Sequence, residues 1–473
     1  MLPTPENYTI WPSVLPAGKR VRMTITAAER AFLPQEGAVY TIIIIPVGED
    51  EPSYYHPSSF TALTAEAHDG VICFEHIFQG EMEHLIVLYQ GEKRLQKMVV
   101  YALEEDLYGL IPFKGDFHAH SYRSDGKRDP AALAGHYREQ GYDFLALTDH
   151  NRYYSGGEID EAYAGVATGL HHVQGEEIHA PTICVHIVHV GGEKSVAEFY
   201  VHNREAYEQE ATAYMAAVPE HIPEQYRERY SKVMWAADRI HEAGGMAIFP
   251  HPYWRPGSTK MNNVDVHLAR LILTSGKIDA YELLGAMTQM GNNLSVALWS
   301  ELRAEGYDIP VVGSSDVHEI EKSERFPHIF TICLAEENED GALMEAVRQH
   351  RSVAVAASGE DYGREYRCYG KLRMVTYAQY LLHHYFPRLQ RISQGTGTAM
   401  RAYAMEEVPA AAIEHQTAMA EDFRLRFFGR KEAQKPSKGL LAWESKWRDV
   451  QKNGPLSKGS EVYIPPEKQN YQI

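Results

Sequence analysis

The chain has 473 residues, too many for one ordinary hydrophobic core, so we expect two or three domains. Its composition is globular, with 44% hydrophobic and 23% charged residues, which excludes a fibrous or largely disordered protein. The formal charge of −18 argues against long-range attraction to nucleic acid or to an anionic membrane.

Cysteine usage and the N-terminal sequence indicate a cytoplasmic protein with reduced thiols. The four cysteines lie far apart and form no CxxC pair, which argues against a disulfide framework and a zinc–thiolate site. The N-terminus has neither a basic nor an apolar signal-peptide region. The strongest apolar run, residues 40–45, is far too short to span a bilayer.

Residues 1–108 are predicted to form an all-β, sandwich-like domain. Runs of β-branched and aromatic residues occur at 21–26, 40–45, 71–74 and 84–89, and Gly, Pro and acidic turns separate them. About seven short strands would fit such a sandwich. This stretch contains no constellation of catalytic residues.

Residues 109–360 alternate between expected strands and helices. Strands are expected to end near residue 120 and to cover 144–147, 172–174, 184–190, 246–249, 280–284, 310–312 and 330–334. Helices are expected after Asp129-Pro130 and over 232–242 and 293–304. This order predicts a parallel sheet, open or closed into a barrel. Residues 193–230 interrupt the order and look like a helical insertion, either a lid or, more commonly, a solvated helical hairpin.

Residues 361–473 are predicted to be a helical extension with an extended tail. Helices are expected over 377–386 and 411–428. The tail from residue 430 shows no periodicity and is expected to be an extended arm, packed on the barrel or on a second copy of the chain.

Histidines and carboxylates gather where the apolar strands of the central region end. His118 and His120 have the two-residue spacing that points side chains to one side of a strand. Asp125 follows in a turn, and Asp149 and His150 follow a wholly apolar strand. The carboxyl ends of parallel strands meet at one face of a βα barrel, where active sites form.

The later strands carry further candidates of the same kind. Glu177 is the preferred bridging carboxylate, with Glu176 as the fallback, because a carboxylate can join two metals and a neutral imidazole cannot. The strand at 184–190 carries His186 and His189, whose odd spacing places them on opposite faces, so at most one is expected to face the site. His251, Asp316 and His318 complete the set.

In order, these motifs resemble those of the polymerase and histidinol phosphatase (PHP) superfamily, over about residues 112–356. The resemblance rests on His118-Ala119-His120 with Ser124-Asp125-Gly126, Thr148-Asp149-His150, Gly175-Glu176-Glu177-Ile178, His186, Pro250-His251-Pro252 and Ser315-Asp316-Val317-His318. The leading β-rich region and Lys114-Gly115-Asp116 look most like the branch that includes carbaryl-type carbamate hydrolases. In that branch a Gly precedes the histidine of the 184–190 strand, and here Val185 stands in its place.

The resemblance implies a distorted (βα)7 barrel of the PHP type and two or three divalent metals. It assigns one metal to His118, His120, Glu177 and Asp316, a second to Glu177, His186 and His251, and a third to Asp125, His150 and His318. Imidazole and carboxylate ligands favour Zn, Mn or Fe.

The expected reaction is hydrolysis of a small, anionic substrate, above all a phosphate ester. Asp149 or a nearby histidine is expected to handle protons, and Arg255 to hold the substrate anion, with Arg123 and Arg152 as weaker candidates. One alternative is a carbamate, ester or amide hydrolase with the same metals. Another is a non-catalytic metal-binding module joined to a ligand-binding β-domain. A nucleic-acid enzyme is disfavoured by the acidic charge.

Overall fold

The computed structural model describes residues 7–48, 59–255, 261–285, 288–359 and 364–453. Within these ranges the chain divides into two compact units. Unit 1 runs over residues 105–425, and unit 2 combines the residues up to 104 with those from 426 onwards. Residues 361–473, expected as one extension, are therefore shared between the two units.

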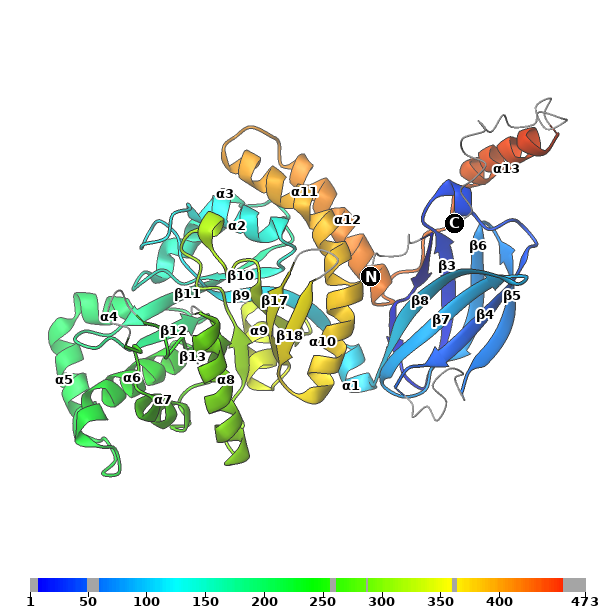
Figure 1. The fold of residues 1–473 in the computed structure, drawn as a ribbon. Coiled ribbons are helices and arrows are strands. Elements are labelled where there is room, and N and C mark those ends of the chain that lie inside the picture. The colour runs from blue at the N-terminus through cyan, green and yellow to red at the C-terminus, as the bar shows by residue number, and fades with distance from the viewer. Residues whose placement is uncertain (1–6, 49–58, 256–260, 286–287, 360–363, 454–473) are drawn as a thin grey trace, which may run out of the picture. The chain divides into compact units, whose positions relative to one another are not determined.

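Unit 2 is built on one eight-stranded sheet that is folded into two layers (Figure 1). The strands follow the order β1-β3-β6-β5-β4-β7-β8-β2, and only β2 and β8 pair in parallel. Strand β5 pairs with β4 along most of its length and with β6 at its end, so it joins the two layers. The strands are β1 (Tyr8–Trp11), β2 (Val14–Pro16), β3 (Arg20–Ala27), β4 (Val39–Pro46), β5 (Thr61–His68), β6 (Val71–Ile77), β7 (Met82–Gln90) and β8 (Lys93–Leu103).

The C-terminal part of unit 2 is helical where an extended arm was expected. Helix α13 (Lys438–Asn453) packs on the sheet unit, and Arg448 Nη2 donates to the carbonyl oxygen of Leu33 at 2.8 Å. The prediction of an extended arm was wrong. Leu440, Trp443 and Trp447 follow helical spacing, and the prediction overlooked this periodicity. Residues 454–473 of the expected arm lie outside the described residues.

Unit 1 contains a ten-stranded mixed sheet that curls towards a barrel (Figure 1). Its order is β15-β14-β13-β12-β11-β10-β9-β16-β17-β18. The curl brings the chain after β15 to the end of β9, where Asp316 N donates to His118 O at 2.8 Å and His120 N to Val317 O at 3.0 Å. The strands are β9 (Ile111–Ala119), β10 (Phe144–Leu147), β11 (His171–His179), β12 (His186–Val190), β13 (Met246–Phe249), β14 (Ala280–Leu284), β15 (Val311–Gly313), β16 (Ile329–Ala335), β17 (Ser352–Ser358) and β18 (Glu365–Tyr369).

Strand directions depart from the expected parallel sheet in two places. Strands β9, β10 and β11 pair in parallel, as do β13, β14 and β15. Strand β12, however, is antiparallel to both of its neighbours, and β16, β17 and β18 are also antiparallel. The alternating pattern did not reveal this because the wholly buried β12 looks the same in either direction.

Helices cover the curled sheet of unit 1. Asp129 caps α2 as predicted, its Oδ1 accepting from Ala132 N at 2.9 Å. Helices α2 and α11 touch through Gly135 and Gly397, since a Cβ on Gly397 would lie only 2.3 Å from Glu139 N. The helices are α1 (Glu105–Tyr108), α2 (Pro130–Glu139), α3 (Gly157–Ala162), α4 (Ala197–His202), α5 (Arg204–Ala216), α6 (Glu224–Glu242), α7 (Val266–Leu273), α8 (Gln289–Ala304), α9 (Asp340–Arg348), α10 (Leu372–His384), α11 (Phe386–Ala404) and α12 (Ala411–Phe427). In the part of the chain that the structure describes, no helix is both long and apolar enough to cross a membrane.

Candidate metal centre

All nine predicted ligand side chains meet at one rim of the curled sheet. They fall into overlapping groups whose potential ligand atoms lie within 4.8 Å of one another. Three of these groups are His118, His120, Glu177 and Asp316; then Glu177, His186 and His251; and then His120, Asp125, His150 and His318. A fourth group joins His150 and Glu177 to His179. Residues spread over about two hundred positions of the sequence thus share one small volume.

Glu177 lies at the middle of the centre and is fully buried. Its Oε1 lies 2.6 Å from His186 Nδ1 and 3.0 Å from His251 Nε2. Its Oε2 lies 3.3 Å from His118 Nε2 and 3.4 Å from His120 Nε2. The two carboxylate oxygens therefore face two different pairs of histidines.

Asp316 and Asp125 provide the other carboxylates of the rim. Asp316 Oδ1 lies 3.0 Å from His120 Nε2 and 3.4 Å from His118 Nε2. Asp125 Oδ1 lies 3.2 Å from His318 Nε2 and 3.4 Å from His150 Nε2. The third group is more exposed than the other two, because the Asp125 side chain is 57% exposed.

The donor set fits divalent cations better than it fits hydrogen bonding among the side chains alone. Glu177 Oε2 is surrounded by imidazole nitrogens, yet within the described residues it has no hydrogen bond of acceptable geometry. His150 Nδ1 lies 2.8 Å from that oxygen and is likewise unsatisfied. Buried polar atoms without partners are rare, and cations between these atoms would satisfy them.

The electrostatics keep the carboxylates ionised but divide the imidazoles. Burial would lower the pKa of His118, His150, His251 and His318, but the surrounding carboxylates raise it above the usual value. Burial lowers the pKa of His120 and of His186 to about 4, outweighing the nearby carboxylates. Burial would raise the pKa of Glu177 and of Asp316, but the surrounding imidazoles bring both pKa values below their usual range. Metal binding requires ionised carboxylates and neutral imidazoles, so a cation would displace protons from the four histidines whose pKa is raised.

The backbone is strained at two candidate ligands. His251 has φ +26° and Asp316 has φ +46°, in a region that residues other than glycine seldom adopt. Such conformations cost on the order of 1–3 kcal/mol each and gather at functional sites.

Glu282 holds the candidate ligand His118 in position through the ring nitrogen that points away from the centre. Glu282 Oε2 lies 2.8 Å from His118 Nδ1, and both side chains are fully buried. Burial would lower the pKa of His118, but Asp316, Glu177 and Glu282 together raise it. With Nδ1 bonded to Glu282, Nε2 is the His118 nitrogen that points into the centre.

Asp116 joins the first and last segments of the rim. Its Oδ1 accepts from His118 N at 3.1 Å, and its Oδ2 accepts from the Tyr137 hydroxyl at 2.8 Å. Both oxygens lie 3.1 Å from Ser315 N. One buried carboxylate thus fixes the backbone beside His118 and Asp316.

The structure assigns Asp149 a positioning role. Its Oδ1 accepts from Ser121 N at 2.8 Å and from the Ser124 hydroxyl at 2.6 Å, and its Oδ2 accepts from the Ser121 hydroxyl at 2.6 Å. Asp149 is fully buried, and these contacts hold the loop after His120.

The predicted anion-binding arginines do not reach the centre. Arg255 is exposed, and its Nε donates to Asn262 Oδ1 at 2.9 Å. Arg123 is paired with Glu158, with Nη2 2.8 Å from Oε2, and Arg152 is exposed. None of the three shows a contact with the predicted ligands.

Of the two histidines on β12, His186 is the one at the centre. His189 instead pairs with Glu176, its Nδ1 3.2 Å from Oε1, and stacks on Tyr153. The expectation that every candidate follows the C-terminal end of a strand is wrong for His186. Because β12 runs antiparallel, its first residue lies at the rim.

Sequence reasoning missed His179 and Arg325. The ring of His179 stacks on His186 with centroids 3.7 Å apart, and its Nε2 lies 3.7 Å from Glu177 Oε2. The two-residue spacing from Glu177 was a usable signal. Arg325 Nη1 lies 3.5 Å from Asp316 Oδ2. Arg325 comes from an irregular segment, where no periodicity predicts side-chain direction.

Comparisons with known proteins give distant likenesses only. No known sequence family and no curated protein matches the chain. A two-domain protein from Bacteroides vulgatus, containing a predicted PHP-like metal-dependent phosphoesterase, is 18% identical, with a TM-score of 0.35. That match covers 52% of this chain and just under two thirds, 66%, of the other. An amidohydrolase from Chromobacterium violaceum with bound sulfate and no metal is 20% identical over 44% of this chain and 89% of its own, with a TM-score of 0.31. Likenesses this distant carry no weight for the activity of this chain.

Proposed function

We propose that unit 1 is a metal-dependent hydrolase with a PHP-type centre on a distorted (βα)7 barrel. It would hold two or three divalent ions, Zn, Mn or Fe, with the ligand distribution that the motifs imply. The observation that carries the proposal is the position of Glu177. Its two oxygens face separate histidine pairs, as a carboxylate bridging two cations must.

The bound metals would supply a Lewis acid and a water acidified to near neutral pH. The protein's own residues prepare this chemistry. Glu282 fixes the His118 tautomer, and Asp116 holds the backbone at both ends of the rim. His251 and Asp316, both with a left-handed φ, lie 3.0 Å from Glu177 and His120 respectively.

The proposed substrate is a phosphate ester, with Arg325 as the anion-binding residue in place of Arg255. The Arg325 guanidinium touches the outer oxygen of Asp316, and its side chain is 24% exposed. Its remaining N–H groups can therefore reach a substrate at the rim. Arginine binds phosphate oxygens in pairs, a geometry that an uncharged carbamate cannot offer.

His179 is the proposed proton carrier, because both carboxylate oxygens of Asp149 already accept hydrogen bonds from Ser121 and Ser124. Its ring is 31% exposed, and within the described residues its Nε2 has no hydrogen bond of good geometry. A histidine beside the reacting group can protonate a leaving oxygen.

The test is to load the purified full chain with Zn, Mn or Fe and to assay aryl phosphate mono- and diesters beside an aryl carbamate and an aryl acetate. We expect phosphate-ester hydrolysis that chelation abolishes. His186→Gln should lower kcat/KM by about 10²-fold or more, whereas the matched control His189→Gln should not. Equal effects of the two substitutions would contradict the proposed centre.

The role of Arg325 is tested separately. Arg325→Gln should raise KM for phosphate esters and weaken inhibition by inorganic phosphate by about 10-fold or more, since hydrogen bonds to charged groups contribute about 1.5–3 kcal/mol. Arg255→Gln is the control. Faster hydrolysis of the carbamate than of any phosphate ester would instead favour the carbamate-hydrolase alternative.

A further inference from the structure

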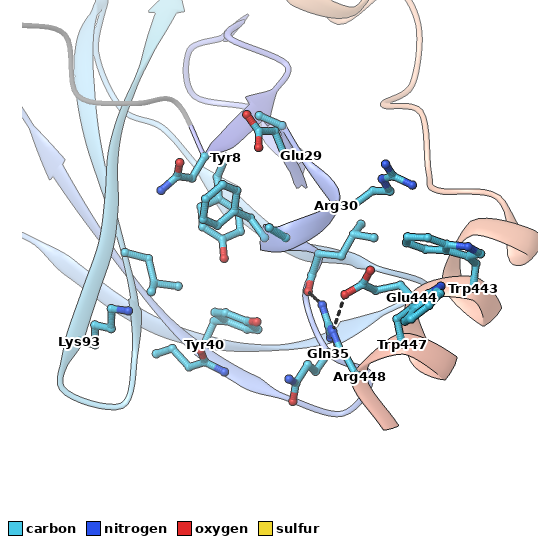
Figure 2. A pocket seen from close by; sticks show the side chains of 17 residues that line it. Tyr8, Glu29, Arg30, Gln35, Tyr40, Lys93, Trp443, Glu444, Trp447 and Arg448 are labelled. Carbon is cyan, nitrogen blue, oxygen red and sulfur yellow. Dashed lines mark hydrogen bonds and ion pairs between the residues drawn. The ribbon is translucent and has the colours of Figure 1, made fainter. Parts of the chain in front are cut away.

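Unit 2 contains a large open pocket between its sheet and helix α13 (Figure 2). Its volume is about 1220 Å³, above the roughly 300–1,000 Å³ typical of pockets for one small molecule. Its walls are residues 28–35, the turn between β7 and β8, and one face of α13. All of these belong to unit 2, and none of the candidate metal ligands lines the pocket.

Two tyrosines form the inner wall of this pocket. Tyr8 and Tyr40 are only 7% and 3% exposed, yet both line it. Figure 2 shows the two rings in different parts of the wall, with Tyr40 on the side of Arg448. Burial raises the pKa of both hydroxyls, and the Arg448 charge opposes this rise. Two neutral hydroxyl groups therefore lie within the electrostatic influence of the Arg448 cation.

Two tryptophans on α13 form the outer wall. Trp443 and Trp447 are four residues apart and so lie on one face of the helix, with ring centroids 6.0 Å apart. They are 44% and 48% exposed, which leaves large indole surfaces open. The Arg30 guanidinium lies 4.6 Å from the Trp443 ring centroid. Adjacent exposed aromatic side chains of this kind are typical of interaction sites.

The polar groups of the pocket are held in place. Arg448 Nε donates to Glu444 Oε1 at 3.0 Å, and its Nη2 donates to Leu33 O at 2.8 Å, so the planar guanidinium is oriented before any ligand arrives. Lys93 and Gln35, both exposed, add donors at the rim. Preoriented donors reduce the entropy lost on binding.

We propose that this pocket binds a carbohydrate, several sugar units long. A sugar ring has an apolar C–H face, which stacks on open indole surfaces, and a polar edge of hydroxyls, which pairs with guanidinium, amide and phenol groups. The pocket places both kinds of partner around one space of suitable size. Charged groups of three elements, Arg30, Lys93 and Arg448, disfavour a purely apolar ligand such as a lipid chain.

The test uses the full chain, with cellohexaose, xylohexaose, mannohexaose and trigalacturonate as probes, followed by tryptophan fluorescence and isothermal titration calorimetry. We expect at least one probe to bind with a micromolar to millimolar Kd. Trp447→Ala and Lys93→Ala, on opposite walls, should each weaken binding, the tryptophan change by about tenfold or more. Phe60→Ala is the matched control, because Phe60 is 56% exposed in unit 2 but lies outside the pocket.

Three outcomes would overturn the proposal. One is that none of the four probes binds below about 10 mM. Another is that binding survives both pocket substitutions while circular dichroism shows an intact fold. The third is that inorganic phosphate binds at this pocket and the sugars do not, which would make it an anion site. Asp316→Ala should leave sugar binding unchanged, so this proposal and the metal-centre proposal fail independently.

Discussion

Glu282→Gln should weaken metal binding without removing a ligand. The carboxylate lies 2.8 Å from His118 Nδ1, and neither side chain is exposed to water. Gln is nearly the same size but loses the charge, and its amide can turn to present an NH2 group, which would favour the wrong His118 tautomer. Carboxylates that support a metal-bound histidine typically contribute 10–100-fold to metal affinity, about 1.4–2.7 kcal/mol.

The assay is competition with a chromogenic chelator, with metal content measured separately, so that no substrate is needed. The loss of metal affinity caused by Glu282→Gln should be larger at high pH than at low pH. Burial would lower the pKa of His118, but Asp316, Glu177 and Glu282 raise it, so protons compete with metal more strongly in the wild type as pH falls. Removing the Glu282 charge relieves part of that competition.

Glu176→Gln is the matched control for Glu282→Gln. Glu176 is also fully buried on a strand and also pairs with a histidine, its Oε1 3.2 Å from His189 Nδ1. That pair lies outside the groups of potential metal ligands. Equal losses of metal affinity in the two variants, or none in Glu282→Gln, would refute the reasoning.

Three further predictions concern stability. Chelation should lower the melting temperature of unit 1 by roughly 4 °C in calorimetry, because a metal at 100 times its Kd contributes about 2.7 kcal/mol, and adding metal back should restore it. In EDTA, the wild type should lose about 2 kcal/mol of stability relative to Asp116→Asn between pH 4 and pH 6. Burial raises the pKa of Asp116 to about 6, so the folded state binds the proton more tightly than the unfolded state, and this contribution fades as pH rises. A constant difference in urea denaturation would contradict this. Arg424→Met should cost about 3 kcal/mol in urea denaturation, because Arg424 is paired with the fully buried Asp143, and adding Asp143→Asn should recover part of the loss.

The sequence predicted which side chains gather at this rim because its signals are local. His118 and His120 share strand spacing, and Asp316 and His318 repeat it. Glu282 was available to the same reasoning, as the only charged residue in the apolar strand β14, but it belonged to no motif. The motifs of the resemblance therefore identify candidate ligands but not the residues that position them.

Features that depend on tertiary pairing could not be predicted in the same way. The spacing of His186 and His189 showed that one faces the centre, but the choice depended on the direction of β12. Arg325 lies in a segment without regular structure, where only the folded chain brings it to Asp316. The helical spacing of apolar residues over 438–453 could be recognised in the sequence. No sequence pattern indicated that this helix packs on the sheet of unit 2.

The antiparallel direction of β12 also determines where residues can be inserted away from the candidate ligands. Val190 pairs with Gly175 and Met246, so the segment carrying α4, α5 and α6 leaves and re-enters the sheet at the end opposite the candidate ligands. The connection between α5 and α6 includes the exposed Glu220 and His221. That connection returns to the ligand side, because Glu228 near the start of α6 contacts Thr182 of the β11–β12 hairpin. A fluorophore or an affinity tag therefore belongs at the exposed Glu193 and Lys194, directly after β12, at the sheet end opposite the candidate ligands.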